Sequence, residues 1–203
     1  MRNVKYSFTN YGFIQIYTGN GKGKTTAALG LALRARGAGL KVAIVYFDKG
    51  GTHYSERKLF KKLGIDYFVS GCDRIDPKTG RFRFGVTPAD IREARAGLKA
   101  AKKFLISKKY DLVILDEINS TVDLKMLTAA EVLKVISRHF PIRRKAGGMP
   151  RRRSGQNPDK AELVLTGRNA PKEFLDIANL VTEMKLVKHY FYRGTRAREG
   201  IDF

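Results

Sequence analysis

Glycine stands at every second position from 19 to 23 in the stretch TGNGKGKTT, residues 18–26, a pattern that suits the binding of a polyphosphate. Glycine backbones can curl so that successive N–H groups point at one anion, and a helix N-terminus adds its partial positive charge. In such a loop Lys24 would reach the terminal phosphates and Thr25 would offer its hydroxyl to a magnesium ion. The candidate phosphate-binding residues are Gly19, Asn20, Gly21, Lys22, Gly23, Lys24, Thr25 and Thr26.

The flanking segments give this loop the context of a P-loop. Residues 13–18 are apolar and β-branched and predict a buried strand, whereas the Ala- and Leu-rich run after Lys24 predicts a helix that ends at Gly37 or Gly39. The template G-x-x-x-x-G-K-[ST] has glycine at its first position, where this chain has Thr18. A glycine-rich hairpin with solvated lysines is the alternative, and the strand–helix setting disfavours it.

Two carboxylates and an arginine also follow predicted strands. Asp116 and Glu117 end the apolar run 110–117, and Arg168 follows the run 161–166. In P-loop proteins a strand that ends in a carboxylate places it beside the bound metal, and spacing does not choose between these two acids. Because the carboxyl ends of parallel strands meet at one edge of the sheet, we expect these side chains to gather beside the P-loop.

The elements that must position these residues alternate along the chain. Further strands are predicted at 41–47, 65–70 and 180–187, and helices at 55–64, 87–109, 127–140 and 170–180. The longest helix has Thr87 as its expected N-cap and Pro88 at its first position. This alternation predicts an α/β fold with three layers, a P-loop (RecA-like) arrangement in which helices cover both faces of a mostly parallel sheet. We expect residues 1–203 to form a single nucleotide-binding domain.

The chain is strongly basic, with 40 Lys+Arg against 19 Asp+Glu and a formal net charge of +21. Such an excess attracts polyanions, including nucleic acid, anionic membranes and polyphosphate. Residues 142–160 contain seven basic residues, three glycines and two prolines, and predict a flexible basic insertion. This insertion could bind nucleic acid, but it lacks aromatic residues that would stack on bases, so a solvated loop extension is favoured.

Two further absences bear on localisation. No apolar run approaches the length of a membrane span, and the N-terminus has no signal-peptide core. The single cysteine, Cys72, cannot form an internal disulfide, which suits a reducing compartment. We therefore expect a cytoplasmic protein that does not bind membranes.

The chain carries, in this order, the segments YTGNGKGKTTAALGLALRARGAGLKV, FDKG, YDLVILDEIN, LVLTGRNAP, VTEMKLVKH and RGTRAREGID. In these segments, which cover most of its length, it resembles the P-loop corrinoid adenosyltransferases, whose substrates include cob(I)alamin and cob(I)yrinic acid a,c-diamide. Threonine at the first P-loop position, here Thr18, is typical of that family.

The resemblance implies an ATP:corrinoid adenosyltransferase. Such an enzyme transfers the 5′-deoxyadenosyl group of Mg-ATP to Co(I) of a reduced corrinoid and releases triphosphate. It implies ATP and Mg²⁺ (or Mn²⁺) as cofactors, the corrinoid as co-substrate, a homodimer and an electron-donor protein. It assigns Lys24, Thr25 and Glu117 to catalysis, Thr25 and Glu117 to the metal, and Arg168 to nucleotide binding.

The chain departs from the family on the corrinoid side. Asp48 replaces an apolar residue, Ser120 stands where tyrosine is common, and the chain has no tryptophan. The loop 71–87, which holds aromatic residues against the corrinoid in relatives, has only Phe82 and Phe84. Two alternatives therefore stay open: a P-loop NTPase that has lost the corrinoid site, and an ATP-dependent nucleic-acid-binding protein.

Overall fold

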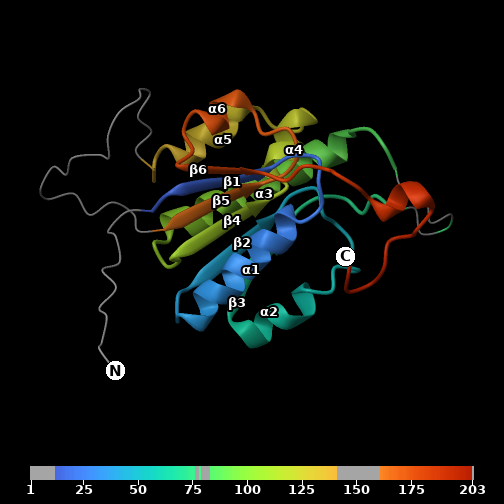
Figure 1. The fold of residues 1–203 in the computed structure, drawn as a ribbon. Coiled ribbons are helices and arrows are strands. Elements are labelled where there is room, and N and C mark those ends of the chain that lie inside the picture. Colours follow the sequence, from blue (N-terminus) through green and yellow to red (C-terminus); the bar gives the residue numbers. More distant parts are fainter. Residues whose placement is uncertain (1–11, 76–77, 79–82, 141–160, 203) are drawn as a thin grey trace, which may run out of the picture.

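A computed structural model describes residues 12–75, 78, 83–140 and 161–202 (Figure 1). The basic insertion predicted at 142–160 lies outside these residues, and so does Phe82. Within the described part of the chain, no helix is both long and apolar enough to cross a membrane.

Six strands form one sheet, in which every pair of neighbours is parallel. The order across the sheet is β3-β2-β4-β5-β1-β6. The strands are β1 (Ile14–Thr18), β2 (Val42–Tyr46), β3 (Ile65–Val69), β4 (Leu112–Asp116), β5 (Glu162–Thr166) and β6 (Leu180–Glu183). The order places the carboxyl ends of β4 and β5 beside that of β1, where the P-loop begins.

Helices cover both faces of the sheet, so the predicted three-layer α/β fold is confirmed (Figure 1). The helices are α1 (Lys24–Gly37), α2 (Arg57–Leu63), α3 (Pro88–Ile106), α4 (Ile118–Asp123), α5 (Ala129–Ile136) and α6 (Lys172–Leu175), and a 3₁₀ helix spans Tyr190–Arg193. Side chains of α1 and α2 pack on one face, and side chains of α3 to α6 pack on the other.

The alternation of side chains along the strands explains this sandwich. On β2, Ile44 packs with the α1 and α2 side and Val45 packs with the α3 side. On β4, Ile114 likewise packs with the α1 and α2 side and Leu115 packs with the α3 side. Every residue of both strands is buried, as expected when helices cover both faces of a parallel sheet.

The N-terminus of α3 agrees with the sequence. Thr87 caps the helix by accepting a hydrogen bond from the Asp90 N–H, Asp90 accepts one from the Thr87 N–H, and Pro88 occupies the first turn. Arg83 binds the Asp90 carboxylate through two hydrogen bonds, of 2.8 and 3.0 Å. The cap therefore also fixes the end of the loop that leads into α3.

Three elements differ from the predictions. Helix α4 was not predicted, and α6 is one turn long where a helix over 170–180 was expected. Strand β6 ends at Glu183 rather than at residue 187. The cause is the P-loop: Met184 accepts a hydrogen bond from the N–H of Gly21, so the chain leaves the sheet to run along that loop.

Candidate nucleotide-binding site

The P-loop joins the carboxyl end of β1 to the N-terminus of α1, and its glycines are required by conformation and by space. Gly19 and Gly23 have φ of +97° and +114°, which L side chains rarely adopt. Gly21 donates its N–H to the carbonyl oxygen of Met184 at 2.7 Å, and a Cβ on Gly21 would lie 2.8 Å from that oxygen. The segment after β6 therefore supports the loop from outside.

Thr18 has a role that glycine could not perform. Its hydroxyl accepts a hydrogen bond from the N–H of Ala170 at 3.1 Å, and its carbonyl accepts one from the N–H of Met184 at 2.8 Å. The first position of the P-loop is thereby tied to the chain after β5 and to the chain after β6. This explains structurally how the loop accommodates threonine at the position that is glycine in the general template.

Lys24 lies over the loop that precedes it. Its ammonium donates to the carbonyl oxygens of Gly19 and Gly21, at 2.9 and 2.7 Å, and the residue is 7% exposed. Burial lowers the pKa of Lys24; Glu117 opposes the shift, and the positive charge of Arg168 adds to it. A buried cation held only by neutral carbonyl oxygens is well prepared to bind a phosphate group.

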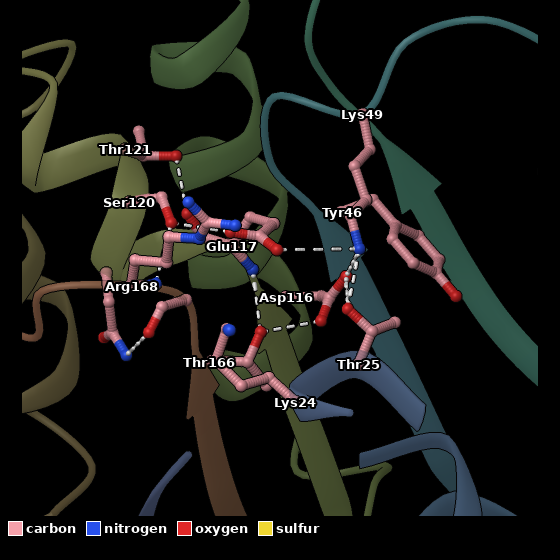
Figure 2. Close-up of polar contacts among 12 residues, drawn as sticks. Lys24, Thr25, Tyr46, Lys49, Asp116, Glu117, Ser120, Thr121, Thr166 and Arg168 are labelled. Atoms are coloured by element: carbon pink, nitrogen blue, oxygen red, sulfur yellow. Dashed lines mark hydrogen bonds and ion pairs between the residues drawn. The ribbon is translucent and has the colours of Figure 1, made fainter. Parts of the chain in front are cut away.

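The carboxylate of Asp116 is held at the end of β4, beside the first turn of α1 (Figure 2). The buried hydroxyl of Thr166 donates to its Oδ1 at 2.7 Å, and Thr25 Oγ1 lies 3.2 Å from its Oδ2. Lys49 donates to the same Oδ2 at 2.5 Å and to Thr25 Oγ1 at 2.7 Å. Asp116, at 1% exposed, is thus the carboxylate in contact with the P-loop threonine.

Glu117 lines the same site from a different direction. Its Oε2 accepts a hydrogen bond from Ser120 at 2.6 Å, and its Oε1 lies 3.9 Å from the ammonium of Lys49. Its φ is +63°, a conformation that costs energy for a residue with a side chain and persists where the surroundings hold it. Here the Glu117 N–H donates to Thr166, and α4 begins immediately afterwards.

Lys49 was not among the predicted site residues. It follows β2, and the rule that brought together the ends of β1, β4 and β5 applies to β2 as well, because β2 pairs directly with β4. Burial alone would lower the pKa of Lys49, but the charges of Asp116 and Glu117 outweigh it and raise the pKa. Lys49 is therefore a cation at neutral pH.

Other predicted residues face away from this cluster in the structure. Lys22 donates to Tyr190, to the carbonyl of Ile201 and to Asp202, and so ties the P-loop to the C-terminal segment. Asn20 accepts a hydrogen bond from the N–H of Leu186. These contacts hold the outer side of the loop.

Arg168 and Thr26 are exposed at the edges of the site. The N–H of Arg168 donates to the hydroxyl of Ser120 at 2.9 Å, which fixes its backbone beside Glu117. Thr26 lies in the first turn of α1. Their contact with a nucleotide stays a prediction.

Thr25, Asp116 and Glu117 offer a hydroxyl and two carboxylates, which are the types of oxygen ligand that magnesium prefers. In the described residues there is no group of three or more His, Cys, Asp or Glu side chains that could enclose a metal. Mg²⁺ is usually held by one or two protein oxygens together with phosphates and water, and these residues fit that mode. The ammonium of Lys49 between Thr25 and Asp116 shows that the position attracts a cation.

Two of the segments in which the chain departs from the resembled family are loops next to the site. Asp48, whose φ is +51°, binds Arg74 at 2.7 Å, and Arg74 donates to the carbonyl of Gly85 at 2.7 Å. Phe84, one residue earlier, is 85% exposed. The charge introduced at Asp48 is therefore paired, and the pair connects the end of β2 to the loop that carries Phe84.

The fold and this cluster define a P-loop nucleotide-binding protein. The family model described as "ATP:corrinoid adenosyltransferase BtuR/CobO/CobP" matches residues 10–143 and 154–203, and the gap between the two matched ranges falls inside the predicted basic insertion. The chain therefore belongs to the ATP:corrinoid adenosyltransferase family, and it is a transferase of that family. The resemblance seen in the sequence is confirmed.

Curated relatives agree with this assignment. The chain is 32% identical to the corrinoid adenosyltransferase of Escherichia coli strain K12, over 95% of this chain and 86% of the relative. It has the same identity and coverage with the corrinoid adenosyltransferase CobA of Salmonella typhimurium. It is also 33% identical to an uncharacterised Nostoc protein, all2391, of which it covers 48%.

Proposed function

We propose that this protein binds Mg-ATP on its P-loop and transfers the 5′-deoxyadenosyl group to Co(I) of a reduced corrinoid. The electron pair of the cobalt substrate forms the bond to the 5′ carbon, the bond between that carbon and its oxygen breaks, and triphosphate leaves with those electrons. The observation that carries this proposal is the meeting of Lys24, Thr25 and Asp116 at one edge of the sheet, in a chain of this family.

The groups of the chain that this reaction needs are those that stabilise the leaving triphosphate. The P-loop N–H groups and the partial charge of α1 bind the phosphates, and Lys24 exchanges its carbonyl partners for phosphate oxygens. Magnesium, when bound, would neutralise further charge on the leaving group, with Thr25 and Glu117 as ligands and Asp116 as a third oxygen donor.

No nucleophile or general base from the protein is required, since the corrinoid supplies the nucleophilicity. The protein therefore acts by positioning and by electrostatic stabilisation. Arg168 adds a positive charge at the edge of the same site. A homodimer, an electron-donor protein, Mn²⁺ as a substitute ion and a cytoplasmic location are proposed on the family resemblance alone.

The test is anaerobic incubation with Mg-ATP and a chemically reduced corrinoid, in which the light-sensitive adenosylcorrinoid is followed by its absorption spectrum. The wild type should form the product, and Lys24→Ala should lower the rate by about a hundredfold or more, as expected for removing a preorganised charge. Lys41→Ala changes an exposed lysine before β2, at the opposite edge of the sheet, and should retain wild-type activity. Equal rates in all three proteins would show that the assigned site is wrong.

A further inference from the structure

Lys49 is a second buried ammonium in the nucleotide site, and it comes from a different element than Lys24. It lies in the loop between β2 and α2, whereas Lys24 begins α1. Figure 2 shows its ammonium at the centre of the cluster, joined to Thr25, Asp116 and Glu117. Its side chain is 14% exposed, so little of it is hydrated.

The backbone of Lys49 is fixed. Its carbonyl accepts a hydrogen bond from Arg57 at 2.6 Å, and its N–H donates to the carbonyl of Ser70 at 3.2 Å. The guanidinium of Arg57 lies between the rings of Tyr46 and Tyr54, 4.6 and 4.2 Å from their centroids. Because this contact anchors the loop, any movement of the ammonium must come from the flexible four-carbon side chain.

The ammonium occupies the place where the proposed function requires a divalent cation. It lies 2.7 Å from Thr25 Oγ1 and 2.5 Å from Asp116 Oδ2, and a magnesium ion bound to this hydroxyl would lie about 2.1 Å from it. Two cations cannot share the same oxygens at these separations. Binding of the metal must therefore displace the ammonium of Lys49.

The new anion at that moment is the triphosphate, which the metal brings to the same edge of the sheet. The ammonium of Lys49 contacts Thr25 and Asp116 and lies 3.9 Å from Glu117, and the proposed function assigns the oxygens of all three residues to the metal. A poorly hydrated ammonium released there will bind the remaining strong acceptor, which is the triphosphate. Lys49 comes from the loop after β2 and Lys24 from the start of α1, so the two ammonium groups reach this edge of the sheet from different elements. Both are therefore available to one phosphate chain bound at the P-loop.

We propose that Lys49 is a triphosphate-binding residue of the transferase site. In the nucleotide-free protein its ammonium replaces the metal between Thr25 and Asp116; when the metal binds, it moves to the triphosphate. This inference rests on the proposed function, because it requires a triphosphate and a divalent cation to bind together at the P-loop.

The test uses one substitution, Lys49→Met, and two binding measurements on the full chain. The first is Mn²⁺ binding to the nucleotide-free protein, followed by electron paramagnetic resonance. The second is calorimetric binding of inorganic triphosphate at saturating Mg²⁺. The matched control is Lys109→Met, which removes the same charge from a lysine–carboxylate pair with Asp66, at an exposed site.

The two affinities should change in opposite directions. Without the competing ammonium, Lys49→Met should bind Mn²⁺ several-fold more tightly; without a charge-assisted contact, it should bind Mg-triphosphate about tenfold more weakly. Lys49→Arg, which keeps the charge, should retain most of the triphosphate affinity, and Lys109→Met should change neither value. If Lys49→Met does not fold, Lys49→Gln replaces it with the same expectations.

Unchanged triphosphate affinity in the variant, or Mn²⁺ binding that does not become tighter, would overturn the proposal. A purely structural role predicts that both affinities fall together, which is a different result. Failure of the wild type to bind Mg-triphosphate at all would instead contradict the proposed function. The two failures are therefore distinguishable.

Discussion

Thr166→Val tests whether the end of β5 holds the carboxylate of Asp116 in place. Valine has nearly the shape of threonine, so the substitution removes the hydroxyl and little else at this fully buried position. That hydroxyl donates to Asp116 at 2.7 Å and accepts from the N–H of Glu117 at 2.9 Å. The variant therefore leaves a buried carboxylate and a backbone N–H each with one partner fewer.

The expected cost follows from those two contacts. A hydrogen bond to a charged group contributes about 2 kcal/mol and an unsatisfied buried N–H costs about 1 kcal/mol, so the free energy of unfolding should fall by about 3 kcal/mol. For a domain of this size, that corresponds to a melting temperature lower by about 6–12 °C. Urea denaturation followed by circular dichroism measures the change in the free energy of unfolding.

The matched control is Thr182→Val on the exposed edge strand β6. It should remain within about 0.5 kcal/mol of the wild type, as for most surface substitutions. A Thr166→Val protein as stable as this control would refute the reasoning, because the carboxylate would then need no support from Thr166. Weaker Mg-ATP binding by Thr166→Val is also expected, since Asp116 would be less well positioned.

Two further predictions concern the supports of the site. Gly21→Ala should weaken Mg-ATP binding by about tenfold or more and destabilise the protein by about 1–3 kcal/mol, because the added Cβ would lie 2.8 Å from the carbonyl oxygen of Met184. Isothermal titration calorimetry measures the Mg-ATP affinity, and an unchanged affinity would contradict this prediction. Arg83 holds the pKa of Asp90 well below its usual value, so this carboxylate stabilises the fold above about pH 4 and the stabilisation is lost as pH falls below it. The stability difference between wild type and Asp90→Asn should therefore be full at pH 6 and shrink toward pH 2 in urea titrations; a difference independent of pH would contradict the role of the charge.

The sequence predicted the parts of the site that follow from local pattern. Alternate glycines before Lys24 and the strand–helix context were sufficient to identify the P-loop. The apolar run that ends at Asp116 was sufficient to place a carboxylate beside it. Each of these two signals is contained in a stretch of about ten residues. The rule that the carboxyl ends of parallel strands meet at one edge of the sheet then predicted that the P-loop and Asp116 lie together.

What the sequence did not predict depends on contacts between distant segments. The strand-end rule applies to β2 and places Lys49 at this edge of the sheet, but its contact with Thr25 depends on a loop that Arg57, Tyr46 and Tyr54 hold in place, and no short pattern encodes that loop. Whether Asp116 or Glu117 touches Thr25 depends on the left-handed backbone of Glu117, which turns the chain into α4.

Helix α4 itself was missed because it does not have the signature of an amphipathic helix. It is six residues long, and side-chain hydroxyl groups stabilise its N-terminus. Thr121 donates to the carbonyl of Glu117 at 2.8 Å, and Ser120 donates to the Glu117 carboxylate. Strand β6 ended early for a similar reason, since the P-loop provides partners for the chain after Glu183. Such elements are determined by tertiary contacts rather than by periodicity.

The central claim is that ATP is cleaved at its 5′ carbon. The most direct test is anaerobic reaction of the protein with Mg-ATP and a reduced corrinoid, with the phosphate products separated by ion chromatography. We expect one triphosphate for each adenosylcorrinoid formed, and no triphosphate without the corrinoid. ADP and orthophosphate without adenosylation would contradict it and indicate a P-loop NTPase.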